Sequence, residues 1–307
     1  MTGRVTSLGR RDSWEGIRAV VAGFGASGYA AADNLTHLGA SVTALADGAS
    51  ASQLEQAQLL EVLGARVDIR SGATAVLPDD VDVLVVSPGF RPGAPLLEQA
   101  SARGVPVWGE VELAWRLRDP ARPAPWLCVT GTNGKTTTVE MLDTILRAAG
   151  LRSVAAGNVG LPLTEAVMDP EPYDVIAVEL SSFQLHYTST VAAESAAVLN
   201  VAEDHVDWHG SMAGYTADKG RIYERVRDAC VYNVADPVTE QLVRDADVVE
   251  GARAIGFTLG VPSVGMVGLV EDVLADRAFV EERATSAAEL CTVADLASPA
   301  PHFVANA

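Results

Sequence analysis

Residues 129–142 read VTGTNGKTTTVEML, and this stretch decides the fold of the second half of the chain. The apolar run WLCVTG at 126–131 predicts a strand, and TTTVEMLDTILRAAG after it has the spacing of a helix. A turn between a strand and a helix directs backbone N–H groups at an anion. The standard pattern G-x-x-x-x-G-K-[ST] has glycine where this chain has Val129, which favours a tighter loop with Gly131 supplying the turn.

The loop residues predict a nucleotide-phosphate site. Lys135 is placed to bridge the outer phosphates, and the hydroxyl of Thr136 to bind magnesium. The remaining members of the predicted loop are Gly131, Thr132, Asn133 and Gly134. The alternative is an ordinary strand-to-helix turn with a solvated lysine, but Gly-Lys-Thr-Thr after a strand favours the phosphate loop.

Two later segments carry candidate ligands at strand ends. DVIAVELSSFQL (174–185) predicts a buried strand with Glu179 at its end, where a carboxylate can hold the magnesium of a nucleotide, although such a glutamate is often structural. The segment 200–210 contains an acidic and histidine cluster, which is either a solvated loop or a group that holds a second metal or orients a substrate. Its members are Glu203, Asp204, His205, Asp207 and His209. Lys219, in YTADKGRIYERV, has the pattern of a surface charge on a helix.

A second glycine-rich turn, GFGASG at 23–28, matches the dinucleotide fingerprint G-x-G-x-x-G. The apolar run IRAVVAG before it predicts a strand, GYAAADNLTHLGA after it a helix, and SVTALAD a second strand. Asp47, nineteen residues after Gly28, is placed to accept a hydrogen bond from a ribose hydroxyl. These features fit NAD and equally fit any nucleotide diphosphate.

The alternation of strands and helices predicts the fold class α/β, with two doubly wound parallel-sheet domains. A Rossmann-like domain is expected over residues 1–118, a proline-rich linker over 119–125, and a P-loop ATPase-like domain over 126–307. Within the second domain a helix is expected through 214–226, and strands and turns at the edge of the sheet after residue 251. The final residues, APHFVANA, indicate the first turn of a helix.

Composition narrows the functional class. The 307 residues are 49% hydrophobic, enough for a core in each domain. A formal charge of −18 disfavours nucleic acid and anionic membranes as partners. Three cysteines without a C-x-x-C pair argue against disulfides or zinc and favour a cytoplasmic protein. The N-terminal region faintly imitates a secretory signal after Arg10 and Arg11, but its glycines would break the apolar helix of such a signal.

Five strings in this order resemble the Mur ligases of peptidoglycan synthesis: GTNGKTTT, GNVG, ELSSFQL, NVAEDHVD and YTADKGRIY. The resemblance spans nearly the whole chain and is strongest to the D-glutamate-adding branch of the family. ELSSFQL is the most discriminating string, because ligases that add other amino acids, or glutamate to folates, usually carry different residues after that glutamate.

The resemblance implies one nucleotide for each glycine-rich loop. The loop from Gly131 to Thr137, with Asn306, would hold ATP. The first-domain turn would hold the UDP end of UDP-N-acetylmuramoyl-L-alanine, through Ala26, Ser27, Asp47, Ser87, Pro88 and Gly89. Further along the path of this substrate the resemblance places Asn158, Ser181 and His205, and it implies catalytic roles for Lys135, His205 and Lys219.

The resemblance also implies two magnesium ions and a modified lysine. Thr136 and Glu179 would bind the first ion. Lys219, carboxylated by carbon dioxide, would serve the second together with His205. ATP would phosphorylate the substrate carboxylate, and the amine of D-glutamate would attack the resulting acyl phosphate, as in an ATP-dependent acid–amino-acid ligase.

Two departures from the family pattern set further expectations. The chain has His302-Phe303 where the family often has His-Asn, which leaves Asn306 as the adenine-side contact. The family also has a C-terminal domain that binds the incoming amino acid, and the residues after Gly251 are too few for it. We therefore expect a monomer that binds UDP-substrate and ATP without completing ligation.

Three alternatives remain open at this point. The chain could be another Mur-type or folylpolyglutamate-type ligase. It could be a nicotinamide-dependent oxidoreductase built on GFGASG, although this leaves the Lys135 loop and Glu179 unexplained. It could also be a binding module that captures a UDP-sugar or ATP without turnover.

Overall fold

The computed structural model describes residues 2–307, which fall into two compact units. Unit 1 comprises the chain up to Ala124 together with 156–173 and 186–190. Unit 2 comprises 125–155, 174–185 and 191–307. Two short excursions of the chain beyond Ala124 therefore pack with unit 1.

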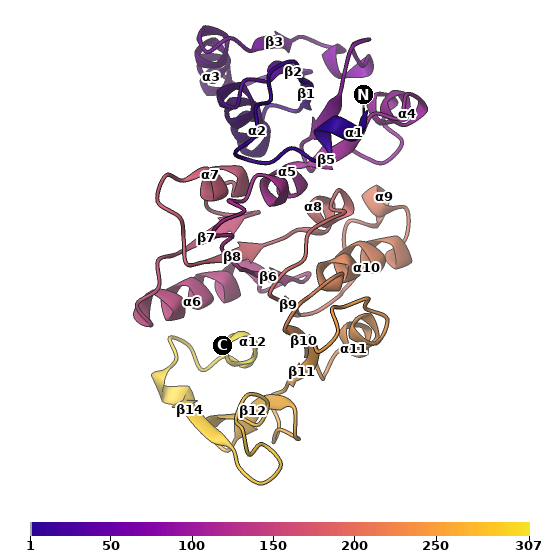
Figure 1. The fold of residues 1–307 in the computed structure, drawn as a ribbon. Coiled ribbons are helices and arrows are strands. Elements are labelled where there is room, and N and C mark those ends of the chain that lie inside the picture. Colours follow the sequence, from indigo (N-terminus) through magenta and orange to yellow (C-terminus); the bar gives the residue numbers. More distant parts are fainter. Residues whose placement is uncertain (1) are drawn as a thin grey trace. The chain divides into compact units, whose positions relative to one another are not determined.

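Unit 1 contains a five-stranded sheet in the order β3-β2-β1-β4-β5, with every pair of neighbours parallel (Figure 1). This order puts the switch point of a doubly wound sheet between β1 and β4, where such sheets bind ligands outside the carboxyl ends of the strands. The strands are β1 Arg18–Ala22, β2 Ser41–Ala46, β3 Arg66–Ile69, β4 Val83–Val86 and β5 Val107–Gly109.

One helix of unit 1 begins at a capping box in the sequence. The helix α3 is capped by Ser50, whose hydroxyl accepts from the N–H of Gln53 while the Gln53 side chain bonds back to the Ser50 N–H. The helices are α1 Thr2–Val5, α2 Ala26–His37, α3 Ala51–Val62, α4 Pro95–Ala102, α5 Glu110–Arg116 and α7 Leu163–Met168, with a 3₁₀ turn η1 at Ala73–Ala75.

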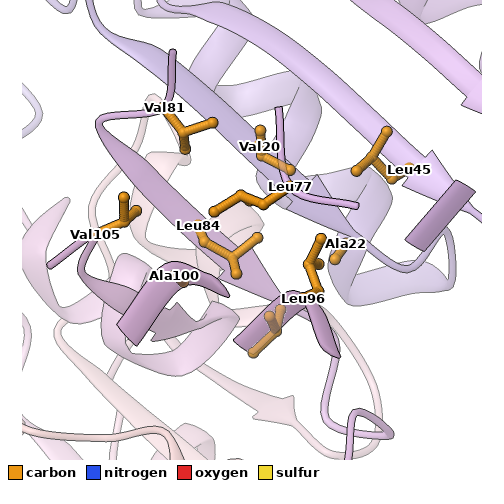
Figure 2. Packing of buried hydrophobic residues seen from close by; sticks show 10 residues of the cluster. Val20, Ala22, Leu45, Leu77, Val81, Leu84, Leu96, Ala100 and Val105 are labelled. Atoms are coloured by element: carbon orange, nitrogen blue, oxygen red, sulfur yellow. The ribbon is translucent and has the colours of Figure 1, made fainter. Parts of the chain in front are cut away.

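Figure 2 shows the core that fixes β1 and β4 against α4. Val20 of β1, Leu84 of β4 and Leu96 and Ala100 of α4 belong to one cluster, and all four are buried. Each such large aliphatic side chain contributes about 1.5–3 kcal/mol when removed from water. Strands β1 and β4, which flank the switch point of unit 1, are therefore held by a common core.

Unit 2 contains a nine-stranded sheet in the order β14-β13-β12-β11-β10-β9-β6-β8-β7. The pairs from β8 through β6, β9, β10 and β11 to β12 are parallel, which confirms the predicted α/β class. At the edge, β12, β13 and β14 pair antiparallel. The strands are β6 Trp126–Thr130, β7 Ser153–Gly157, β8 Val175–Glu179, β9 Ser195–Val198, β10 Ala229–Asn233, β11 Arg253–Phe257, β12 Met266–Val270, β13 Val273–Asp276 and β14 Ala288–Thr292.

The helix predicted through 214–226 is shorter in the structure. Helix α10 ends at Gly220 and is followed by a single 3₁₀ turn, Arg221–Tyr223. The Tyr223 hydroxyl bonds to the backbone of Val198 and Val231, and Arg225 has a positive φ of 60°. The turn is therefore fixed onto β9 and β10, which overrides the helical pattern.

Most helices of unit 2 connect its parallel strands along the chain. They are α6 Lys135–Ala148, α8 Ser182–His186, α9 Val206–His209, α10 Met212–Gly220, α11 Pro237–Arg244 and α12 Pro301–Asn306, with 3₁₀ turns at Arg221–Tyr223 (η2) and Val293–Asp295 (η3). The last residue of α8 is grouped with unit 1. Within residues 2–307, no helix is both long and apolar enough to cross a membrane.

Candidate functional site

The candidate site of unit 2 lies where three parallel strands end. Strand β6 pairs with β8 on one side and β9 on the other, so their carboxyl ends share one edge. The loop from Gly131 to Gly134 follows β6, Glu179 ends β8, and the segment from Asn200 to His205 follows β9. The sequence alone placed all three at strand ends, and the sheet order brings them to one edge.

The glycines of this loop are required by its geometry. Gly134 has φ +87°, and a Cβ there would lie 2.5 Å from Nδ2 of Asn306. A Cβ on Gly131 would lie 3.1 Å from Cβ of Leu199. Val129, which replaces the first glycine of the standard pattern, is a buried residue of β6 paired with Glu179. The loop is therefore shorter than the standard one, because the strand continues through the position of the missing glycine.

Asn200 braces the loop from the neighbouring strand end. Its side-chain oxygen accepts from Asn133 N at 2.9 Å, and its Nδ2 donates to Asn133 O at 3.0 Å. Its backbone carbonyl accepts from Thr132 N at 2.9 Å. Asn200 was not among the predicted site residues, although an asparagine at a strand end beside the loop was a usable signal.

Both lysines of the chain converge on this loop. Only Lys135 and Lys219 are lysines among the 22 basic residues. Lys135 Nζ donates to the carbonyls of Gly131 at 2.9 Å and Thr132 at 3.0 Å, and Lys219 Nζ donates to Gly131 O at 2.8 Å. The other residues of this basic set are all arginines, so both lysine side chains of the chain lie at this loop.

Lys219 is buried, which corrects the surface position that its helical pattern indicated. It is 2% exposed, and its amine lies 4.7 Å from the ring centroid of Tyr215. Burial, together with the nearby charge of Lys135, lowers the pKa of Lys219 to about 7, while Asp204 opposes the shift. Burial also lowers the pKa of Lys135, with Glu179 and Asp204 opposing. A substantial neutral fraction of Lys219 follows at neutral pH.

Thr136 and Glu179 present two oxygens side by side. Thr136 Oγ1 donates to Glu179 Oε2 at 2.9 Å, and Glu179 is 1% exposed. Hydroxyl and carboxylate oxygens next to a phosphate loop are the ligands that Mg²⁺ takes in nucleotide sites. Over residues 2–307, no three or more His, Cys, Asp and Glu side chains are grouped so as to hold a metal ion.

The two histidines of the 200–210 cluster have different surroundings. His205 is half exposed, with Nε2 3.4 Å from Asp204 Oδ2, and its backbone has a positive φ of 48° at the start of α9. His209 has a fully buried side chain. Of the pair, His205 is the one exposed to solvent beside the loop.

Two further predicted residues have structural partners in unit 2. Ser181 caps α8, where its Oγ and the side chain of Gln184 exchange hydrogen bonds with the backbone. Asn306 lies on α12 against Gly134. Thr137 is in the first turn of α6, whose N–H groups lack acceptors within the helix.

The glycine turn of unit 1 is set by close packing. Gly23 has φ +95°, and a Cβ there would lie 2.4 Å from Ser87 Oγ. A Cβ on Gly28 would lie 2.0 Å from the carbonyl oxygen of Gly23. Gly25 has open space around it. Ser87, whose Oγ is buried without a hydrogen-bond partner, follows β4, so the turns after β1 and β4 meet at the switch point.

The other predicted substrate residues are spread over unit 1. Asp47 accepts hydrogen bonds from the N–H and hydroxyl of Thr74, which hold its pKa below the ordinary value. Ala26 and Ser27 begin α2, and Pro88 and Gly89 follow Ser87. Asn158 is exposed and lies in the segment 156–173 that packs with unit 1. Their roles in binding a substrate stay predictions.

Sequence comparison identifies close relatives of this chain. Residues 129–264 match the Mur ligase middle domain. The UDP-N-acetylmuramoylalanine--D-glutamate ligase of Streptomyces avermitilis is 58% identical over 295 residues, covering 96% of this chain and 62% of the relative. The protein of the same name from Leifsonia xyli is 47% identical, covering 95% and 60%. The chain thus spans about three fifths of the length of these curated relatives.

Solved structures share the fold at low identity. The UDP-N-acetylmuramate:L-alanyl-gamma-D-glutamyl-meso-diaminopimelate ligase of Neisseria meningitides superposes with a TM-score of 0.53 and 19% identity, covering 84% of this chain and 83% of that one. A murein peptide ligase of Psychrobacter arcticus gives a TM-score of 0.50 at 16% identity, covering 95% and 63%. The chain is therefore similar in sequence to UDP-N-acetylmuramoylalanine--D-glutamate ligases over about three fifths of their length, and it shares the fold of the two solved ligases.

Proposed function

We propose that this chain acts in the ATP-dependent ligation of D-glutamate to UDP-N-acetylmuramoyl-L-alanine, through an acyl phosphate. The observation that carries the proposal is the convergence of both lysines with Thr136 and Glu179 on one short loop. The names of the relatives supply the substrates. The proposed boundaries are 1–118 for the UDP-substrate domain and 126–307 for the ATP domain.

In this proposal the loop from Gly131 to Thr137 binds the phosphates of ATP. The first-turn N–H groups of α6 lack partners within the helix and face an anion. Lys135 exchanges its two loop carbonyls for phosphate oxygens, and Asn306, which lies against Gly134, contacts the adenine side. The hydrogen bond from Asn133 N to the side-chain oxygen of Asn200 would keep the tight loop in the conformation that accepts the phosphates.

Two magnesium ions are proposed to bind beside the loop. Thr136 and Glu179 would hold the first ion, which would neutralise charge on the transferring phosphoryl group. Lys219 is proposed to carry a carbamate and to hold the second with His205. Carbamate formation needs a neutral amine, whose nitrogen bonds the carbon of carbon dioxide and then releases one proton. The lowered pKa of Lys219 supplies that neutral amine near pH 7.

The protein contributes positioning and charge stabilisation. The substrate carboxylate attacks the terminal phosphorus of ATP, and the bond to ADP breaks, which gives the acyl phosphate. The amine of D-glutamate then attacks the acyl carbon and phosphate leaves. Lys135 is placed to stabilise charge on the phosphoryl oxygens, and His205 and Asn158 are proposed to orient the substrate. Ser181 is proposed as a further substrate contact.

Unit 1 is proposed to bind the UDP end of the substrate at its switch point. The residues assigned to this role are Ala26, Ser27, Asp47, Ser87, Pro88 and Gly89. Ser87 supports the assignment, because its buried hydroxyl lacks a partner at the turn where a ligand oxygen would approach.

Calorimetric titration with ATP, UDP-N-acetylmuramoyl-L-alanine and NADH tests the proposal. We expect binding of ATP with magnesium and of the UDP-sugar, and none of NADH. Hydroxylamine added to the mixture of both substrates should trap the acyl phosphate as a hydroxamate, detected by mass spectrometry. Tight NADH binding without a response to the UDP-sugar would show an oxidoreductase instead.

A further inference from the structure

A buried serine, histidine and aspartate lie in line behind the site of unit 2. His209 Nδ1 is 2.7 Å from Asp218 Oδ2, and His209 Nε2 is 3.0 Å from Ser182 Oγ. The side chain of His209 is fully buried, Ser182 is 2% exposed, and the side chain of Asp218 is 12% exposed. Three different helices contribute to this row: α8, α9 and α10.

The hydrogen-bond roles in the row follow from the carboxylate. An ionised Asp218 is an acceptor only, so Nδ1 of His209 carries the proton and donates it. Nε2 is then the acceptor for the Ser182 hydroxyl in a neutral ring. Both ring nitrogens are bonded, which fixes the tautomer and the orientation of the imidazole. His209 thereby ties the end of α9 to the start of α8 and to α10.

The row of Ser182, His209 and Asp218 is connected to His205 by the ring of Phe183. Phe183 stacks on the ring of His209 at 5.4 Å with an interplanar angle of 11°, and its centroid is 4.7 Å from that of His205. His205 is the left-handed N-cap of α9, and His209 is the last residue of the same short helix. The ring of Phe183 therefore packs against both histidines, and fixing His209 restrains His205.

The row of Ser182, His209 and Asp218 is connected to Lys219 by α10, which carries both Asp218 and Lys219. Tyr215, Asp218 and Lys219 lie three and four residues apart, which places them on one face of the helix. The Tyr215 hydroxyl is 3.0 Å from Thr132 Oγ1, and Lys219 Nζ bonds to Gly131 O. The same helix face thus holds the loop at two points and His209 at a third. The contact with Asp218 sets the rotation of α10 that aims Lys219 at the loop.

We infer that Ser182, His209 and Asp218 form a positioning relay that holds His205 and Lys219 in place for phosphoryl transfer. The inference rests on the proposed function for the reaction it serves. The same three residue types form the nucleophilic triad of hydrolases. A nucleophilic serine must be reached by its substrate, however, and Ser182 is almost fully buried. The relay therefore positions other residues and does not react itself.

Lysine labelling tests the relay without relying on turnover. Because the chain has two lysines, an amine-acylating reagent followed by peptide mass spectrometry reports on Lys219 with Lys135 as the internal reference. We expect His209→Leu to accelerate acylation of Lys219 several-fold more than that of Lys135, since α10 loses its third anchor. His209→Gln should stay close to the unmodified chain, because an amide supplies one donor and one acceptor. Equal Lys219 labelling in all three proteins would overturn the inference.

Kinetics of hydroxamate formation test the same relay in the reaction. For His209→Leu and Asp218→Leu we expect kcat to fall on the order of 10–100-fold, as for residues that orient metal ligands, with the KM for ATP nearly unchanged. His209→Gln should recover most of the loss. His37→Leu, a change at an exposed histidine of unit 1, serves as the matched control. A uniform loss of ATP affinity and thermal stability in His209→Gln would show a merely structural role and contradict the inference.

Two results separate this inference from the proposed function. If the unmodified chain forms no hydroxamate while Lys219 labelling responds to His209→Leu, the proposed reaction fails and the relay stands. If a fluorophosphonate labels Ser182 in the unmodified chain, the serine is a nucleophile and the positioning role is wrong. We expect no such label.

Discussion

The two glycine-rich loops are similar in sequence but differ in the side chains that lie against them. In unit 1 the turn at 23–28 packs against its own backbone and against Ser87, since a Cβ on Gly28 would lie 2.0 Å from Gly23 O and a Cβ on Gly23 would lie 2.4 Å from Ser87 Oγ. In unit 2 the turn at 131–134 faces side chains from other elements, including Lys219, Asn200 and Asn306. The spacing of the glycines indicates only that a strand turns sharply into a helix. The amines and oxygens brought to the turn indicate which chemistry it supports.

Buried ionisable groups sharpen the contrast between the units. In unit 2, Lys219 bonds to the loop itself. In unit 1, Glu110 is 2% exposed at the start of α5, and its Oε1 accepts from the N–H and hydroxyl of Thr164 on α7 rather than from the glycine turn. The buried amine of Lys219 in unit 2 belongs to the candidate site, whereas the buried carboxyl of Glu110 in unit 1 serves the packing of α7.

Lys135→Ala tests whether the two loops act on different nucleotides, and we expect the largest effect here. Removing this amine should lower hydroxamate formation on the order of 10²–10³-fold, as for other single groups that stabilise developing charge. Affinity for UDP-N-acetylmuramoyl-L-alanine should be nearly unchanged, because the turn of unit 1 is built from separate residues. Calorimetry with each ligand measures both.

Lys135→Arg is the matched control for this prediction, because it keeps the charge. It should retain part of the ATP affinity while losing the compact fit of the amine between two carbonyls. Equal weakening of ATP and UDP-sugar binding by Lys135→Ala would break the assignment of one loop to each nucleotide.

Glu110→Gln tests the buried carboxyl of unit 1. Burial raises the pKa of Glu110 from 4.5 to about 7, while Thr164 opposes the shift and Glu165 adds to it. Burial, and then the charge of Asp33, raise the pKa of Glu165. Between these two pH values the folded chain binds one more proton than the unfolded chain, so the stability from this group falls as the pH rises and stays reduced above pH 7.

We therefore expect Glu110→Gln to stabilise the chain at pH 8, by up to about 3 kcal/mol at ~1.4 kcal/mol per pKa unit, and to give no gain near pH 4.5. Thermal unfolding across this range measures the difference. Glu55→Gln, a change at an exposed glutamate of the same unit, is the control. A gain that is constant with pH would mean that the carboxyl is not buried as the structure has it.

The features of the fold and site that the sequence predicted are those that depend on residues close together in the chain. The βαβ alternation, the loop at Gly131 and the strand-end position of Glu179 follow from local period and turn residues. The burial of Lys219 does not, because it depends on Tyr215 and Gly131 meeting across the sheet edge. The row Ser182, His209 and Asp218 joins three helices, and local patterns carry no sign of it. Composition held one unused signal, which is that the chain has only two lysines.

Gly28→Ala and Gly25→Ala test whether the turn of unit 1 is limited by packing. A Cβ at position 28 meets the backbone carbonyl of Gly23, which cannot move aside as a side chain can. We expect a loss of about 1–3 kcal/mol, typical of overpacking, together with weaker UDP-sugar binding. At position 25 the space is open and φ is −79°, so alanine should be nearly neutral for stability. Equal thermal stabilities of the two variants would contradict the packing account.

Gly134→Ala tests whether backbone strain, rather than packing, limits the loop of unit 2. We expect the smallest effect here. Its positive φ of 87° should make alanine unfavourable by about 1–2 kcal/mol, the typical strain of a left-handed residue with a Cβ. The added Cβ would also meet the Asn306 amide at 2.5 Å, but this is the end of a side chain that can rotate away. In an Asn306→Ala background the contact disappears and only the backbone strain is left, so Gly134→Ala should cost less there. Urea unfolding of the two single variants and the double variant gives this coupling energy. Strict additivity would mean that Asn306 does not rest on Gly134 in solution, and only backbone strain would then limit the loop of unit 2.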